Sequence, residues 1–206
     1  MRMNLRIRPL ALSLAVLLAI AAGVLFAIDP FGARETLAQE EMQSSSTVIE
    51  SAAELELPAW MDFELEDALT GEAFRIRDLV GRPILVESFA VWCSTCLRQQ
   101  KEMAKLIELE GDRIVHIALD TDPNEDLETV RKHALRYGFD WYYAVAPIEM
   151  TQMLIEAFGL TVVNAPRAPV VLIEEDGTSR LLESGVKSAE ELLEATGLEP
   201  TEEAGG

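Results

Sequence analysis

The 206-residue chain is poor in cysteine, histidine and basic residues: it has 2 Cys, 2 His and 17 Lys plus Arg against 36 Asp plus Glu. The shortage of Lys and Arg leaves no visible basic patch, which argues against a nucleic-acid partner. The histidines, His116 and His133, have no metal-ligand spacing to the cysteines, so the sequence predicts no metal site. The formal net charge of −19 is explained by a solvated acidic surface or, alternatively, by a docking face for basic partners.

Residues 10–28 carry no charge and follow three arginines within the first eight residues. As a helix this run would span about 28 Å, close to the hydrocarbon thickness of a bilayer. We therefore expect residues 1–28 to be a single-pass membrane anchor, with the N-terminus in the cytoplasm and the remainder outside. The alternative is a signal peptide cleaved near Ala33 or Ala38, which would release a secreted protein. No cysteine follows the run, so lipoprotein processing is not expected there.

The remaining chain divides into three parts by composition. Residues 29–57 contain three consecutive serines and scattered Glu, which is typical of a flexible tether. Residues 58–198 show regular patterns of apolar residues and form the predicted folded domain. Residues 199–206 are predicted to be a disordered tail.

Within the domain, strand and helix patterns alternate. Alternating residues at 63–67 and 74–76 predict an N-terminal β-hairpin, and apolar runs predict strands at 84–89, 113–119, 141–145 and 169–173. Helices are predicted after the cysteines, from Asp122 as a capping residue, over 150–158 and after Ser188. Asp176-Gly177 is a strong hairpin-turn signal that leads into a returning strand.

This order predicts an α/β fold: a central mixed sheet with helices on both faces, completed by an antiparallel hairpin. Sites in open α/β sheets lie at the carboxyl ends of strands, and Cys93 follows the strand at 84–89. Cys93 and Cys96 are three residues apart at the start of the next helix, close enough to form a disulfide. A helix N-terminus favours a thiolate because its free N–H groups and dipole are positive. The pair is therefore predicted to be a redox switch.

The segment Phe89-Ala-Val-Trp-Cys-Ser-Thr-Cys96, followed by a strand that Pro169 opens and by Gly177 eight residues later, resembles the thioredoxin fold. The lead-in at 74–83 is similar to that of membrane-anchored thiol–disulfide oxidoreductases of the TlpA/ResA type. The resemblance covers about residues 60–196. It implies that Cys93 is the attacking thiolate, the more exposed of the two, and that Cys96 is the resolving thiol.

The same resemblance implies roles for four further residues. Glu87 matches the family's buried acid and would take the proton from Cys96; the alternative is an outward-facing Glu at a sheet edge. Pro169 matches the family's cis-proline, with Pro166 as its competitor. The backbone of Ala168 would pair with an extended substrate segment, and Trp92 would shape the rim of the site.

The residues between the cysteines, Ser94 and Thr95, are neither the Gly-Pro of thioredoxins nor the proline-containing pairs of the TlpA type. Because this pair tunes thiolate stability, the redox potential is not predicted. The spacing is one residue shorter than the Cys-x-x-x-Cys of Sco-type copper chaperones. The Thr-x-x-Cys of peroxiredoxins is also missing.

The predicted function is disulfide exchange with client proteins outside the cytoplasm, without a cofactor. The family resemblance favours the reductive direction, with a membrane dithiol as electron donor and apocytochromes or copper-site proteins, as in cytochrome c biogenesis, as example clients. Two alternatives remain open: a redox-dependent metallochaperone or assembly factor that holds a soft metal such as Cu(I), and a client-binding domain with an inert disulfide.

Overall fold

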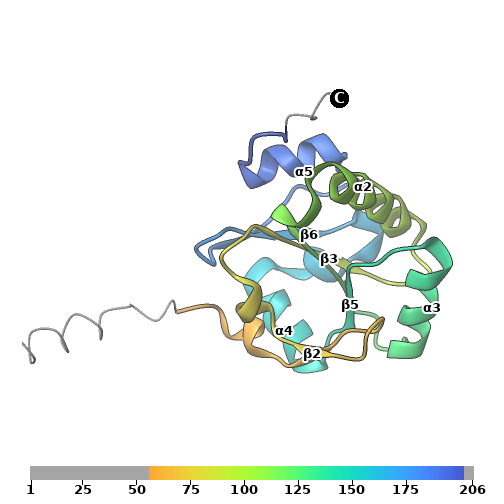
Figure 1. Ribbon diagram of the computed structural model, residues 1–206. Helices are drawn as coiled ribbons and strands as arrows, with labels where there is room; N and C mark the ends of the chain where they lie inside the picture. Colours follow the sequence, from red (N-terminus) through yellow and green to blue (C-terminus); the bar gives the residue numbers. More distant parts are fainter. Residues whose placement is uncertain (1–55, 202–206) are drawn as a thin grey trace, which may run out of the picture. The chain divides into compact units, whose positions relative to one another are not determined.

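The computed structural model describes residues 56–201 (Figure 1). The predicted anchor at 1–28 and all but the last two residues of the predicted tether at 29–57 lie outside the described residues. Within residues 56–201, no helix is long and apolar enough to cross a membrane.

A five-stranded sheet in the order β5-β4-β3-β6-β7 forms the centre of the domain. The three strands β3, β4 and β5 run parallel, whereas β6 and β7 are antiparallel to their neighbours, so the predicted mixed sheet is confirmed. A separate antiparallel pair, β1 with β2, precedes the sheet and is two residues long in each strand. The strands are β1 (Leu65–Glu66), β2 (Ala73–Phe74), β3 (Ile84–Phe89), β4 (Val115–Asp120), β5 (Tyr142–Val145), β6 (Val170–Ile173) and β7 (Ser179–Leu181).

Helices cover both faces of this sheet, as predicted (Figure 1). They are α2 (Ser94–Glu110), α3 (Leu127–Tyr137), α4 (Ile148–Phe158) and α5 (Ala189–Thr196). Successive residues of β3 point to opposite faces. Leu85 therefore packs with Leu106 of α2 and Leu192 of α5, whereas Val86 packs with Leu154 of α4. The short 3₁₀ segments are η1 (Ala59–Asp62), η2 (Ile76–Leu79), η3 (Gly111–Arg113), η4 (Leu160–Val163) and η5 (Ala165–Arg167).

Helix α3 begins later than predicted. Asp122 does not cap it; the cap is Asp126, whose side chain accepts the backbone N–H of Thr129. Residues 121–126 instead form a turn whose side chains reach the loop after β3. The prediction of a helix start at Asp122 is wrong because these tertiary contacts use the side chains that local capping would have needed.

The tight turn between β6 and β7 requires glycine at position 177. Gly177 has a φ of +83°, and a Cβ atom there would lie 2.1 Å from the side chain of Leu57. The Asp176-Gly177 turn predicted from the sequence is therefore also the place where the N-terminal segment of the domain packs against the sheet.

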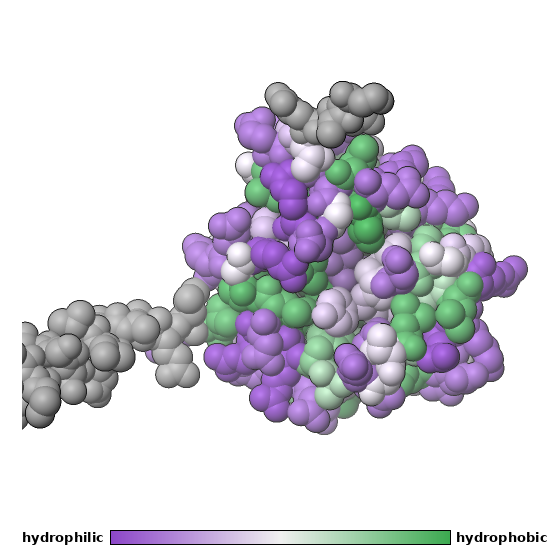
Figure 2. Space-filling view, viewed as in Figure 1, coloured by the Kyte–Doolittle hydropathy of each residue, from purple (hydrophilic) through white to green (hydrophobic). Residues whose placement is uncertain are grey.

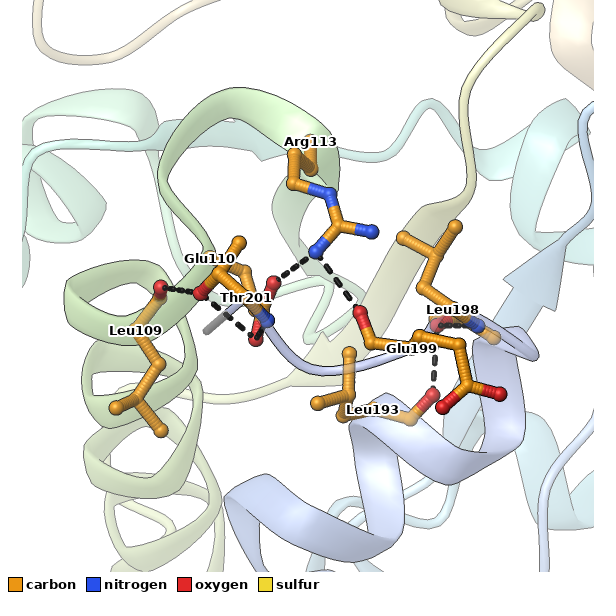
Figure 3. A network of polar contacts seen from close by, with 8 residues as sticks. Leu109, Glu110, Arg113, Leu193, Leu198, Glu199 and Thr201 are labelled. Carbon is orange, nitrogen blue, oxygen red and sulfur yellow. Dashed lines mark hydrogen bonds and ion pairs between the residues drawn. The ribbon is translucent and has the colours of Figure 1, made fainter. Parts of the chain in front are cut away.

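The last described residues are held against the end of α2 (Figure 3). The Thr201 hydroxyl donates to the carbonyl of Leu109, and the Thr201 N–H donates to the Glu110 carboxylate. Arg113 donates to the carbonyl of Glu199 at 3.0 Å and forms an ion pair with Glu110. Glu199 through Thr201 are thus docked, unlike the disorder expected from residue 199 onward, and residues 202–206 lie outside the described residues.

Candidate active site

The two cysteines lie where β3 passes into α2. Cys93 is the N-cap residue of α2 and Cys96 lies in its first turn, with their Cα atoms 5.3 Å apart and their sulfurs joined in a disulfide. Cys93 is only 4% exposed and Cys96 is 0% exposed. The predicted order of exposure holds by a small margin. A hydrogen bond from the Cys93 N–H to the carbonyl of Ala90 closes the turn that leads into α2.

The two sulfurs have different hydrogen-bonding environments. The N–H of Cys96 points at Cys93 Sγ from 3.1 Å, whereas Cys96 Sγ lies 3.2 Å from the carbonyl oxygen of Ala165 in η5. In the reduced pair, an N–H donor favours a thiolate at Cys93, and a carbonyl acceptor favours a protonated thiol at Cys96. This asymmetry suits an attacking thiolate at Cys93 and a resolving thiol at Cys96.

Trp92 stands beside the disulfide and is 63% exposed. Its Nε1–H donates to Asp122 Oδ2 at 2.7 Å, which fixes the indole at the surface. A groove of about 370 Å³ runs along it and is lined on the opposite side by residues from the chain between α4 and β6. The lining comprises Ala90, Trp92, Thr121, Asp122, Pro123, Val163, Asn164, Ala165 and Pro166.

Glu87 is fully buried on β3, which is the central strand of the sheet, so the alternative of an exposed edge position is wrong. Neither carboxyl oxygen has a hydrogen-bond partner of good geometry in the described part of the chain. Burial raises the pKa of Glu87 well above its ordinary value, although nearby Gln100 and Lys187 partly oppose the shift. A carboxyl group whose pKa is raised toward neutral pH is suited to proton exchange.

Pro169 lies at the start of β6, where its carbonyl accepts the N–H of Ser88 at the end of β3. The cis form of its peptide bond stays a prediction. Ala168 differs from expectation because it is fully buried and both backbone groups are in use. Its N–H donates to the carbonyl of Ala165 and its carbonyl accepts from Lys187 Nζ at 2.7 Å. The predicted backbone pairing of Ala168 with a substrate therefore lacks a free N–H, and Pro166, not Pro169, lines the groove.

Lys187 is a buried cation that no strong local sequence pattern predicts. Besides Ala168, its ammonium donates to the carbonyls of Glu183 and Gly185, at 3.1 and 2.6 Å. Burial lowers its pKa to about 8, while the carboxyl of Glu87 opposes this shift. Lys187 thus ties the segment before β6 to the segment before α5. Its only sequence signal is a lysine one residue before a capping serine.

The turn at 121–126 was also missed as part of the site. Glu125 Oε2 accepts the backbone N–H of Val91 at 2.7 Å, two residues before Cys93. Ser88 and Thr121 share a hydrogen bond between their hydroxyls, at 2.9 Å. These contacts join the end of β4 to the loop that carries the cysteines, and no local sequence pattern marks them.

Both histidines are buried, and neither is among the hydrogen-bond partners of the two cysteine sulfurs. His133 on α3 shares a hydrogen bond with Gln100 Oε1 at 2.7 Å, and burial lowers its pKa. His116 on β4 has no hydrogen-bond partner of good geometry, and burial lowers its pKa to about 4. Over residues 56–201, no group of three or more His, Cys, Asp or Glu side chains has an arrangement that could hold a metal ion.

Three features define a thioredoxin-like redox domain: a disulfide-linked cysteine pair at the start of the helix after the central strand, a buried acid on that strand, and a proline at the start of the adjacent antiparallel strand. The chain belongs to the Redoxin family, whose model matches residues 53–195.

Curated relatives are consistent with this family. The chain is 30% identical over 119 residues to a thiol-disulfide oxidoreductase ResA of Halalkalibacterium halodurans, covering 57% of this chain and 61% of the relative. It is 25% identical over 131 residues to the ResA of Geobacillus thermodenitrificans, covering 64% and 70%. The match to the first relative thus spans less than two thirds of its length.

Solved structures confirm the fold. A putative electron transport protein from Aquifex aeolicus aligns with a TM-score of 0.56 at 24% identity, over 66% of this chain and 92% of that one. A thiol:disulfide interchange protein of the thioredoxin family from Chlorobium tepidum aligns with a TM-score of 0.53 at 21% identity, over 66% and 90%. The predicted thioredoxin-like fold is therefore confirmed.

Proposed function

We propose that this protein is a thiol–disulfide oxidoreductase that reduces disulfides in client proteins through Cys93 and Cys96. The observation that carries the proposal is the asymmetric environment of the two sulfurs at the start of α2, next to an open groove. The names of the curated relatives support the same activity. An inert staple is a poor explanation, because closing a loop between residues 93 and 96 constrains the unfolded chain little.

In the proposed reaction, the Cys93 thiolate attacks one sulfur of the client disulfide. A bond forms between Cys93 and the client, and the other client sulfur leaves as a thiolate and takes up a proton. Cys96 then loses its proton and attacks Cys93 Sγ, and the ionised form of the Glu87 carboxyl is the proposed proton acceptor. The client leaves fully reduced by two electrons, and the domain is left with its disulfide. A dithiol donor must return those two electrons.

Client binding is proposed for the groove along Trp92. The groove's far wall, at residues 163–166, presents Pro166, and its near wall presents the exposed indole. An extended client segment could lie between these walls with its disulfide next to Cys93. Trp92 and Pro166 are therefore the proposed substrate-contacting residues, in place of Ala168.

Localisation is proposed from the sequence alone. Residues 1–28 would anchor the protein, residues 29–57 would serve as the tether, and the domain at 58–198 would face the outside of the cytoplasm, with a membrane dithiol as donor. Membrane fractions washed with alkaline carbonate should retain the full chain. A mature protein that starts after Ala33 or Ala38 would contradict the anchor and favour the secreted alternative.

The activity is tested with insulin reduction by the full chain in the presence of a dithiol. Cys93→Ala should lose insulin reduction to background, and Cys96→Ala should accumulate a mixed disulfide with the client. Ser179→Ala, a comparable truncation on β7, serves as the matched control and should keep full activity. Insulin reduction that survives Cys93→Ala would overturn the proposal.

A further inference from the structure

The turn at 121–126 forms hydrogen bonds with two consecutive residues, Val91 and Trp92, of the loop that carries Cys93. Glu125 Oε2 accepts the Val91 N–H and Asp122 Oδ2 accepts the Trp92 Nε1–H, both at 2.7 Å. Cys93 follows at once, in a turn closed by its own N–H on the Ala90 carbonyl. Two acidic side chains therefore bind the two residues that precede Cys93, whose sulfur must become an anion to react.

Asp120 is a third acidic residue next to Asp122 and Glu125, and its carboxyl is held in the neutral form. It is fully buried at the end of β4, and its Oδ1 accepts the N–H of Asp122 at 2.7 Å. Burial, followed by the neighbouring carboxyl of Glu125, raises the pKa of Asp120 to about 9. The protonated form of Asp120 is then favoured at neutral pH, and the adjacent Glu125 side chain holds the active-site loop.

We propose that Glu125 is a positioning residue of the cysteine site: it anchors the loop at Val91 and places a fixed negative charge behind Cys93 that disfavours the thiolate. The inference rests on the proposed function and gives it a direction. Destabilising the thiolate destabilises the reduced form, so the dithiol gives up its electrons more readily. Glu125 thereby biases the couple toward reduction of clients.

Other charged groups lie on the elements around Cys93. Glu87 on β3 and Asp122 in the same turn add negative or potentially negative groups. Lys187, Arg98 on α2 and Arg167 in η5 supply positive ones. The effect of Glu125 must therefore be measured as a difference between two proteins that keep all these groups.

The test is the pKa of Cys93 in the reduced full chain. It is read from the pH dependence of alkylation by iodoacetamide, with the modified residue identified by mass spectrometry. Glu125→Gln keeps an oxygen that can accept the Val91 N–H but removes the charge. We expect the Cys93 pKa to fall by about half a unit, which raises the thiolate fraction about threefold below the pKa. The midpoint potential of the couple should become more positive.

Two further variants make the result specific. Glu128→Gln removes a charge of the same kind from an exposed position on α3, where Glu128 pairs with Lys132, and should leave the Cys93 pKa unchanged. Glu125→Ala removes both the charge and the acceptor for the Val91 N–H, and should also lower the Cys93 pKa.

An unchanged or higher Cys93 pKa in Glu125→Gln would overturn the inference, as would an equal shift in Glu128→Gln. This measurement needs no client. Its failure is therefore distinguishable from failure of the proposed function, which would appear as loss of mixed-disulfide formation in Cys96→Ala.

Discussion

At the scale of single residues, Glu87 combines full burial with a lack of hydrogen-bond partners of good geometry. Such a group is costly when ionised, because an apolar environment disfavours the charged form. Only the nearby Lys187 and Gln100 oppose this cost. A carboxyl kept under these conditions reduces stability at neutral pH, as expected of a residue with the proton-accepting role proposed for Glu87.

The cost of Glu87 should appear as a pH-dependent stability difference. Its pKa is raised in the folded state, so the folded protein holds this proton to higher pH than the unfolded chain does. The folded state is therefore penalised increasingly as pH rises from about 4.5 toward the raised pKa, by at most about 1.4 kcal/mol per unit. Glu87→Gln removes this penalty and should gain stability relative to wild type between pH 5 and pH 7.

Urea unfolding of the oxidised protein at about pH 5, 6 and 7 measures the difference, within the range where Lys187 with its pKa of about 8 stays charged. Resolution of the mixed disulfide should be slower in the same variant. A stability difference that does not change with pH would show that Glu87 is already ionised in the folded state.

Position 87 also shows what a sequence can reveal about a site. A lone Glu inside the apolar run 84–89 can be recognised as unusual from the sequence, because buried parallel strands consist almost entirely of apolar residues. The Cys-x-x-Cys pair is equally visible. Lys187 and Glu125 are not visible in this way, because their partners are distant in the sequence. Lys187 contacts Ala168, 19 residues away, and Glu125 contacts Val91, 34 residues away. Charged residues are ordinary on helix ends and turns, so nothing local sets these two apart.

At the scale of elements, the last helix is a case where local rules suffice. Ser188 accepts the N–H of Glu191, and the Glu191 side chain accepts the N–H of Ser188, as the capping pattern predicts. The helix ends at Gly197 in the left-handed conformation. Helix α5 packs on α2, which carries the cysteines, and Glu102 of α2 also accepts the N–H of Ala189.

The capping box should contribute measurably to stability. Ser188→Ala removes the acceptor for the Glu191 N–H and should cost about 1 kcal/mol, lowering Tm by about 2–4 °C for a domain of this size. Ser188→Gly should cost only a few tenths of a kcal/mol, since glycine leaves the amide open to water. Thermal unfolding of the oxidised protein measures both. Equal losses in the two variants would contradict a capping role.

Helix α3 is the opposite case. Asp122, Pro123 and Glu125 form a good local start signal, yet the helix begins at Leu127. The Asp122 and Glu125 side chains bind Trp92 and Val91 instead, where one fixes an exposed indole and the other a loop amide. The local pattern predicted a helix start at Asp122, which is wrong, because the partners of these side chains lie in the loop after β3.

The segment between α4 and β6 was equally hard to predict. It forms the two 3₁₀ turns η4 and η5, and Ala168 at its end adopts a φ of +47°. Alanine has no intrinsic preference for that conformation. The hydrogen bonds from its N–H to Ala165 and from Lys187 to its carbonyl hold it there. The family resemblance placed Pro169 correctly at the start of β6. It could not show that the N–H and the carbonyl of Ala168 already have hydrogen-bond partners within the domain.

At the scale of the whole molecule, charge is the dominant property. From Pro58 to the last residue the sequence has 13 basic and 29 acidic residues, a balance of 13 − 29 = −16. Figure 2 shows hydrophilic residues around smaller apolar patches on one face of the molecule. A field of one sign attracts substrates of the opposite sign and is screened by salt. The acidity should therefore influence which disulfides reach Cys93.

Small disulfides of different charge measure this influence without a protein client. The reduced full chain should react faster with the cationic disulfide cystamine than with the anionic dithiodipropionate, and uncharged hydroxyethyl disulfide should lie between them. The preference should shrink as salt rises from about 0.01 M to 1 M, because the Debye length falls from about 30 Å to about 3 Å.

Asp122→Asn should reduce the preference more than Glu128→Gln, since Asp122 lines the groove and Glu128 lies on the exposed face of α3. A preference that salt does not change would mean that local contacts in the groove, and not the overall field, select the substrate.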